Sequence, residues 1–202
     1  MNKFFSKNSN FPSLIIIIVG GLISVIIASV LQSGWPEGLF INLEYLYGMH
    51  NDGQVTSARR LFEGWEFNND RQGYPFGSST LDYPKADVGS QVIIKLLGYL
   101  TGSWVASLKL FFLLGFFLTF SSSYLASRLL GLSFSSSILV AFLFTFIPFH
   151  FLRLNHLNFT FYFVIPIYWF IALNFNSVSI MKAIKDSGYL KKILAMLVIF
   201  FL

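Results

Sequence analysis

The run LIIIIVGGLISVIIASVL, from Leu14 to Leu31, contains no charged residue and is long enough to cross a lipid bilayer. A hydrocarbon core about 30 Å thick requires about 20 predominantly apolar residues in a helix. The whole chain of 202 residues has the same character, since 55% of its residues are hydrophobic and only 11% are charged. A soluble domain carries about 25% charged residues. The composition therefore predicts an all-α integral membrane protein.

Further apolar runs predict a polytopic helical bundle that forms one transmembrane domain over residues 1–202. The expected spans are residues 13–31, 109–128, 134–151 and 157–175, and a fifth begins near residue 192. Because a fifth run of some ten residues is too short to cross the bilayer, we expect the chain to be the N-terminal part of a longer protein. A cleaved signal peptide is the other interpretation of the first run, although its apolar core is normally about 7–15 residues long.

Charged residues predict the side of the membrane that each loop faces. Lys3 and Lys7 precede the first span, Arg128 ends the second, and four lysines follow the fourth. A cytoplasmic N-terminus places all of these on the cytoplasmic side, which satisfies the positive-inside rule. The outer loop, residues 32–103, then faces outward. It contains eight of the nine acidic residues: Glu37, Glu44, Asp52, Glu63, Glu66, Asp70, Asp82 and Asp87.

The stretch YGMHNDGQVTSARRLFEG, from Tyr47 to Gly64, opens this loop and predicts a short helix at the membrane surface. Apolar residues in GQVTSARRLFEGW, residues 53–65, recur at three- and four-residue steps: Val55, Ala58, Leu61, Phe62 and Trp65. Asp52 lies just before the helix, where an aspartate often caps free backbone amides. A second short amphipathic helix is expected in VGSQVIIKLLGYLTG, residues 88–102.

A second polar cluster is IPFHFLRLNHLNF, residues 147–159, which the topology places on the same face as the outer loop. His150, Arg153 and His156 step by three, so a continuous helix would hold them on one side. Pro148 predicts that a helix begins, ends or kinks here. Arg153 has two interpretations. It can extend its charge to the lipid headgroups, or it can bind a phosphate through two charge-assisted hydrogen bonds, helped by a histidine.

Several kinds of site are not predicted. There is no cysteine, and hence neither a disulfide framework nor a thiolate metal site. The net charge of +5 comes from scattered basic residues and does not indicate a nucleic-acid partner. The chain has no phosphate-binding glycine loop, no serine-nucleophile elbow and no paired-histidine zinc helix.

Three stretches follow one another along the chain: HNDGQVTSARRLFEG, DYPKADVGSQVIIKLLGYLTGS and SYLASRLLG. In this order they resemble the N-terminal part of GT-C-type glycosyltransferases, polytopic enzymes that use polyprenyl-phosphate-linked sugars. NDRQGYPFGSSTLDYPKAD followed by FIPFHFLRLNHLNF resembles, more closely, a group of uncharacterised bacterial membrane proteins of that type. The resemblance implies a GT-C-like bundle in the bacterial inner membrane, with two surface helices in its outward loop.

The resemblance also implies a reaction and roles for residues. A sugar would pass from a polyprenyl-phosphate donor to a cell-envelope acceptor on the outer face of the membrane, with Asp52 as the catalytic base. The substrate-binding candidates are Arg59, Arg60, His150, Arg153, His156, Asp82 and Asp87. An acidic pair is common at the position of Asn51-Asp52, which here offers one carboxylate, so no metal ligand is assigned and a divalent cofactor stays open. The expected partners are membrane lipid and the lipid-linked sugar donor.

Two other functions stay open at this point. A transporter or flippase for a lipid-linked sugar would share the spans, and its polar groups should line a path through the middle of the membrane. A non-catalytic assembly subunit would use the outer loop to bind a partner, and Asp52 would then only cap a helix. The polar residues gather at one face, which favours surface chemistry, although a truncated chain could be inactive by itself.

Overall fold

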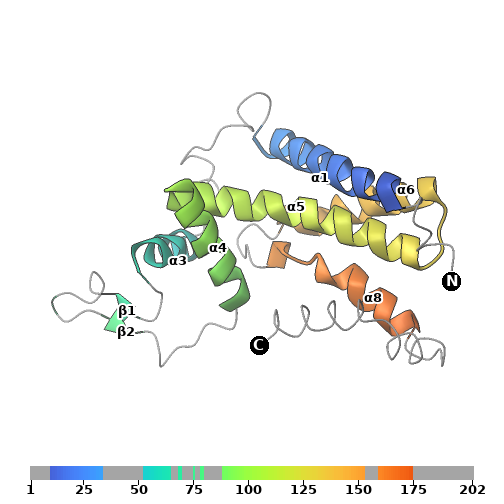
Figure 1. Cartoon of the computed structure of the whole chain (residues 1–202). Coiled ribbons are helices and arrows are strands. Elements are labelled where there is room, and N and C mark those ends of the chain that lie inside the picture. Colours follow the sequence, from blue (N-terminus) through green and yellow to red (C-terminus); the bar gives the residue numbers. More distant parts are fainter. Residues whose placement is uncertain are drawn as a thin grey trace.

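The computed structural model of the protein describes residues 10–33, 52–64, 68–69, 75, 78–79, 88–152 and 159–174. Apart from one short strand pair, the described elements are helices. They are α1 (Asn10–Ser33), α3 (Asp52–Glu63), α4 (Val88–Thr101), α5 (Trp104–Leu129), α6 (Phe134–Thr145), α7 (Pro148–Leu152) and α8 (Val164–Asn174). The strands β1 (Asn68–Asn69) and β2 (Ser78–Ser79) pair antiparallel, with Asn68 opposite Ser79. Figure 1 shows α5 at the centre, with α1, α4 and α8 around it.

Three helical segments are long and apolar enough to cross a membrane, by length and composition: Ser13–Leu31, Trp104–Leu129 and Phe134–Leu152. They fall on the first three expected spans and agree with a helical membrane protein. The third is interrupted between α6 and α7, where Pro148 begins α7. Proline has no backbone N–H to continue the hydrogen bonds of the preceding helix, and it disfavours helical conformation at the residue before it.

The structure describes only part of the fourth expected span, residues 157–175. Its only described α-helix is α8, whose 11 residues are fewer than a bilayer core requires. Pro166 is the third residue of α8, and proline is tolerated in the first turn of a helix but not in its interior. The helix therefore begins only at Val164. The fifth expected span and the lysines before it lie outside the described residues.

The second span begins earlier than expected. Ser103 caps α5, and its Oγ accepts a hydrogen bond of 3.3 Å from the backbone N–H of Ala106. Gly102, with a φ of 66°, makes the turn that joins α4 to α5. Lys109, expected at the start of the span, therefore lies in the second turn of α5. Its side chain is buried, with 2% of the residue exposed.

A tight turn joins α5 to α6. Gly131 has a φ of 89°, and the backbone N–H of Leu132 donates to the Ser127 carbonyl oxygen at 3.1 Å. This pattern commonly closes the C-terminus of a helix. Arg128 Nη1 also donates to the Leu132 carbonyl oxygen at 2.7 Å. Ser133 then caps α6 by accepting a hydrogen bond from the backbone N–H of Ser136.

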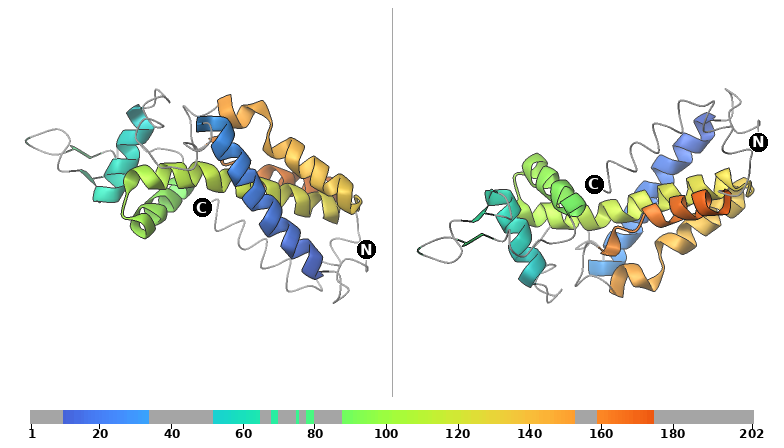
Figure 2. Two further views of the ribbon diagram at one scale, coloured as in Figure 1. Left: turned by 90° about the horizontal axis from the view of Figure 1, so that it is seen from above. Right: turned by 90° about the horizontal axis from the view of Figure 1, so that it is seen from below.

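Small residues on α1 allow it to approach α5 closely. Gly20, Ser24 and Ala28 recur at four-residue steps and are buried. A Cβ atom on Gly20 would lie 2.2 Å from the ring of Phe120 on α5. In lipid, helices associate through close packing of this kind, and small residues are enriched at such contacts. The large aliphatic residues of α1 are left on its outer side, and Figure 2 shows α1 crossing α5.

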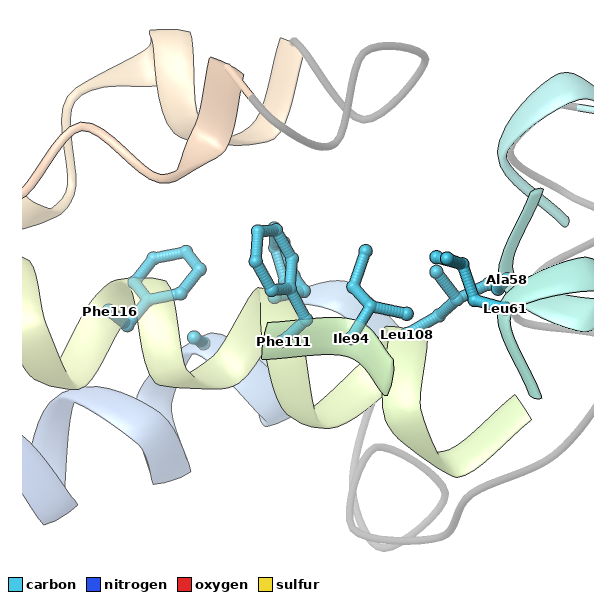
Figure 3. Close-up of a cluster of buried hydrophobic side chains, with 8 residues drawn as sticks. Ala58, Leu61, Ile94, Leu108, Phe111 and Phe116 are labelled. Atoms are coloured by element: carbon cyan, nitrogen blue, oxygen red, sulfur yellow. The ribbon is translucent and has the colours of Figure 1, made fainter. Parts of the chain in front are cut away.

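Two groups of buried apolar side chains follow α5. The first extends from α3 to the middle of α5 (Figure 3) and consists of Ala28, Ala58, Leu61, Ile94, Leu108, Phe111, Phe112 and Phe116. The second consists of Phe120, Tyr124 and Ala141. Ala58 and Leu61 belong to the apolar stripe of α3 that was expected to face the membrane surface. This part of the stripe instead packs against protein, because α4 and α5 cover it.

Replacing Gly20 by alanine tests the α1–α5 contact. The new methyl group would meet the buried ring of Phe120, and overpacking of this kind costs about 1–3 kcal/mol. We expect a lower midpoint of thermal unfolding in detergent than for the unchanged protein. Gly64→Ala is the control, because a Cβ atom at Gly64 would meet nothing within 4 Å. Equal midpoints for the two variants would contradict the close approach.

Candidate functional site

Helix α3 carries three of the residues singled out in the sequence. Its backbone begins at Asp52, so this residue lies at the N-terminal end of the helix. The free N–H groups there favour a negative charge nearby. Arg59 and Arg60 lie near its C-terminal end. The side chain of Asp52 lies outside what the structure describes, as do Asp82, Asp87, Arg153 and His156 entirely.

The two arginines of α3 differ in their surroundings. Arg59 Nε donates to Glu63 Oε1 at 3.1 Å, and 59% of the Arg59 side chain is exposed. Such an exposed ion pair contributes about 0–1 kcal/mol. Arg60 is half-buried, and its buried Nε has no hydrogen-bond partner among the residues that the structure describes. A buried donor that lacks an acceptor is costly, and an anionic ligand would supply one.

A lysine from α4 joins the end of α3. Lys95 Nζ donates to the carbonyl oxygen of Gly64, just beyond the last turn of α3. It also lies 5.5 Å from the centre of the Tyr99 ring, a cation–π contact. A cation at a helix C-terminus is favourable because the free carbonyl groups there carry partial negative charge. The α3–α4 pair therefore holds three cationic side chains close to one end of α5.

His150 occupies a different kind of position. It is fully buried, and its ring stacks on that of Phe116 with centroids 3.6 Å apart and planes inclined by 5°. Its Nδ1 lies 3.2 Å from the Thr145 carbonyl oxygen and 3.0 Å from the Tyr162 hydroxyl. Because a carbonyl oxygen can only accept, this contact favours a proton on Nδ1. The Tyr162 hydroxyl in turn donates to the Phe144 carbonyl oxygen at 3.3 Å.

These contacts give His150 and Tyr162 a structural role. The last carbonyl groups of a helix have no partner within it, and Phe144 and Thr145 are the last two residues of α6. The imidazole and the phenol supply those partners from beyond the break between α6 and α7. The buried Nε2 of His150 has no hydrogen-bond partner within the described ranges and faces Gly115 of α5, where an added Cβ would lie 3.3 Å from it.

His150 was predicted to bind a phosphate at the membrane surface together with Arg153. The structure corrects this placement, because the imidazole is enclosed by aromatic rings and none of it is exposed. The spacing of three from His150 to Arg153 does not reveal this, since it fixes a side of a helix but not what that side faces. His150 is therefore a residue of the protein interior.

Helix α3 and His150 pack against successive parts of α5. Leu61 of α3 lies beside Leu108 of α5 in Figure 3. His150 of α7 packs on Phe112 and Phe116 of the same helix. From Leu108 to Phe116 is about 12 Å along a helix axis. One half of α5 thus supports both regions that were singled out in the sequence.

Two residues of interest were missed in the sequence. Lys109 is buried beside Leu108, at the level of α5 that supports α3. A charge inside an apolar span is costly and often functional. The position of Lys109 within an apolar run could therefore have identified it from the sequence. Tyr162 meets His150 only through the fold, and no local pattern indicates that contact. Among the described residues, no three His, Cys, Asp or Glu side chains come together as a group that could hold a metal ion.

Comparisons with protein-family models, with curated proteins and with solved structures find no match to this chain.

Replacing His150 by alanine distinguishes an interior residue from a surface ligand. The change removes a stacked ring and the partner of the Thr145 carbonyl oxygen, so we expect a loss of about 2–4 kcal/mol of stability. A surface substitution costs at most about 0.5 kcal/mol. Thermal unfolding in detergent measures the difference. Phe149→Ala, at a neighbouring position that is 41% exposed, is the control and should lose less.

Proposed function

We propose that this protein is a membrane glycosyltransferase of the GT-C type, which transfers a sugar from a polyprenyl-phosphate donor to an acceptor at one face of the membrane. The observation that carries the proposal is Arg60, which lies on the short helix that begins with Asp52 and whose buried Nε has no acceptor among the described residues. That helix packs against one end of α5, a helix long enough to cross the membrane. The proposal is that this end of α5 lies at the depth of the lipid phosphate, where Asp52 and Arg60 would act.

The proposed reaction uses Asp52 as a general base. Its carboxylate accepts the proton of the acceptor hydroxyl as the oxygen attacks the anomeric carbon of the sugar. The bond between that carbon and the phosphate oxygen breaks, and polyprenyl phosphate leaves with the electron pair. The negative charge that develops on the departing phosphate requires nearby cations or hydrogen-bond donors.

The arginines of α3 are proposed to stabilise that charge. Asp52 and Arg59 are seven positions apart, so a helix places them on nearly the same side, about 10 Å apart along its axis. Arg60 lies one position further along. A guanidinium suits a phosphate because its planar array of N–H groups can donate two hydrogen bonds to phosphate oxygens. The ion pair between Arg59 and Glu63 is exposed and weak, so breaking it to bind an anion would cost little free energy.

Transport of a lipid-linked sugar is the second candidate function. Thr119 and Ser123 lie one turn apart in α5, and their buried hydroxyl groups have no hydrogen-bond partner in the described part of the chain. Polar groups at such a depth can line a transport path. They can also hold helices together. Transfer chemistry is preferred because Arg59 and Arg60 of α3 lie near the beginning of α5 rather than along its middle.

The Asp52→Asn variant tests the proposed base. We expect loss of sugar transfer with unchanged expression, because an amide cannot accept the proton at neutral pH. Membranes carrying each protein would be compared for consumption of endogenous polyprenyl-phosphate sugars and for new glycan. Asp186→Asn makes the same chemical change in the lysine-rich loop after the fourth expected span, and it should retain activity. Transfer by Asp52→Asn at the unchanged rate would remove Asp52 from the mechanism.

The two arginines should differ in their effect on the same assay. Arg60→Gln removes a cation whose Nε has no partner in the part of the chain that the structure describes, so we expect kcat/KM to fall by about 10–100-fold, the value of one or two charged hydrogen bonds. Arg59→Gln should cost less, because Arg59 is more exposed and already paired with Glu63. The reverse order would contradict the role given to Arg60.

A further inference from the structure

Two hydroxyl groups in the second half of α5 differ in their hydrogen bonding from their neighbours on the same helix. Ser121 Oγ donates to the carbonyl oxygen of Phe117 at 2.7 Å. Ser122 Oγ donates to the carbonyl oxygen of Thr119 at 3.2 Å. Thr119 Oγ1 and Ser123 Oγ are buried and have no hydrogen-bond partner in the part of the chain that the structure describes. A hydroxyl group in a helix can bond to a carbonyl oxygen one turn earlier, so these two require a partner outside their own helix.

A third buried polar atom approaches the same side of α5. Nε2 of His150, which also lacks a hydrogen-bond partner among the described residues, lies 3.3 Å from the position that a Cβ atom on Gly115 would occupy. The carbonyl oxygen of Thr160 lies 3.3 Å from the same position. Gly115, Thr119 and Ser123 recur at four-residue steps and form one ridge of the helix. Because helical side chains lean toward the N-terminus, Thr119 leans over the turn that contains Gly115.

The chemistry of these groups specifies the ligand that would satisfy them. The Thr160 carbonyl oxygen can only accept a hydrogen bond, and His150 Nε2 accepts one because the contact of Nδ1 favours the ring proton on that atom. Thr119 and Ser123 are about 6 Å apart along the helix axis, which exceeds a direct hydrogen bond of about 3 Å. A water molecule both donates and accepts hydrogen bonds, so it can bridge groups at such a separation.

We propose that water is bound inside the protein, at the ridge of α5 that faces α7. Its hydrogen-bond partners are His150 Nε2, the Thr160 carbonyl oxygen and the hydroxyl groups of Thr119 and Ser123. These four residues are at most 3% exposed, so the site is enclosed by protein. Buried polar groups of this kind commonly share an internal water molecule. The inference does not depend on the proposed glycosyl transfer.

Bound water has a structural consequence for the third membrane-crossing segment. A hydrogen bond from water to Nε2 of His150 keeps the ring proton on Nδ1. Nδ1 then donates to the Thr145 carbonyl oxygen at the end of α6. A buried Nε2 with no donor would be costly. The water therefore helps to fix the break between α6 and α7 from the side of α5.

Nuclear magnetic resonance of threonine methyl groups tests the proposal, because the chain offers a matched pair. Thr119 and Thr145 are both fully buried in membrane-crossing segments, but Thr145 Oγ1 donates to the Ala141 carbonyl oxygen at 2.7 Å. The full chain, deuterated and labelled with carbon-13 at its threonine methyl groups, would be studied in lipid nanodiscs. The signals lost in Thr119→Val and in Thr145→Val assign the two methyl groups. Magnetisation transfer from water protons then reports whether water lies beside each one.

We expect magnetisation transfer from water to the Thr119 methyl group and none to that of Thr145. Transfer to both, or to neither, would overturn the proposal, because Thr119 would then not differ from a threonine whose hydroxyl group is bonded within its own helix. A water-soluble paramagnetic chelate should broaden neither signal. Broadening of the Thr119 signal would overturn the enclosed site in favour of a path that opens to the solution.

Thermal unfolding of Thr119→Val gives a second measurement, since valine keeps the shape of the side chain and removes its hydroxyl group. We expect a lower midpoint than for the unchanged protein, because a hydrogen bond to water is lost. An unchanged or higher midpoint would contradict bound water, because removing a buried hydroxyl group without a partner is favourable. Ser122→Ala is the control and should change the midpoint less, since Ser122 bonds within its own helix. Neither measurement involves sugar transfer, so each result is independent of whether Asp52 is a catalytic base.

Discussion

The phenylalanine rings of α5 reach the backbone of α1 because Gly20 and Gly21 place no side chain in their way. In water, burial of such rings would itself drive the helices together. Within a bilayer the acyl chains are equally apolar, so close packing has to supply the attraction. The contact fixes one side of α5, and the described elements α3, α4, α6 and α8 then pack along the remainder of the same helix. The geometry of the candidate site follows from this arrangement.

Much of the fold could be predicted because membrane spans are local. An uncharged run of sufficient length predicts α1 without knowledge of its neighbours, and the apolar period after Asp52 predicts α3. What each helix faces is not local. Ala58 and Leu61 were expected at the membrane surface, yet the structure buries them under α4 and α5. An apolar stripe shows that one side of a helix lies against an apolar environment, but either lipid or protein can provide that environment.

The same limit explains the candidate site. The N-terminal position of Asp52 on a helix could be predicted from the residues around it, but the burial of His150 could not. The residue that pairs with its Nδ1, Tyr162, is 12 positions away, and no local sequence pattern links the two. A polar side chain near a break in a helix can bind a ligand, or it can form hydrogen bonds with the free backbone groups at the helix end. Here His150 and Tyr162 form hydrogen bonds with the carbonyl oxygens of Thr145 and Phe144, respectively.

The turn between α5 and α6 also restricts how the chain can enter the membrane. Only residues 130–133 separate the two helices, and four extended residues span at most about 14 Å. That is less than half the thickness of a hydrocarbon core of about 30 Å. The end of α5 and the beginning of α6 must therefore stay on the same side of the bilayer at every moment. The two helices would therefore insert into the lipid as one hairpin, and the orientation of one would fix the orientation of the other.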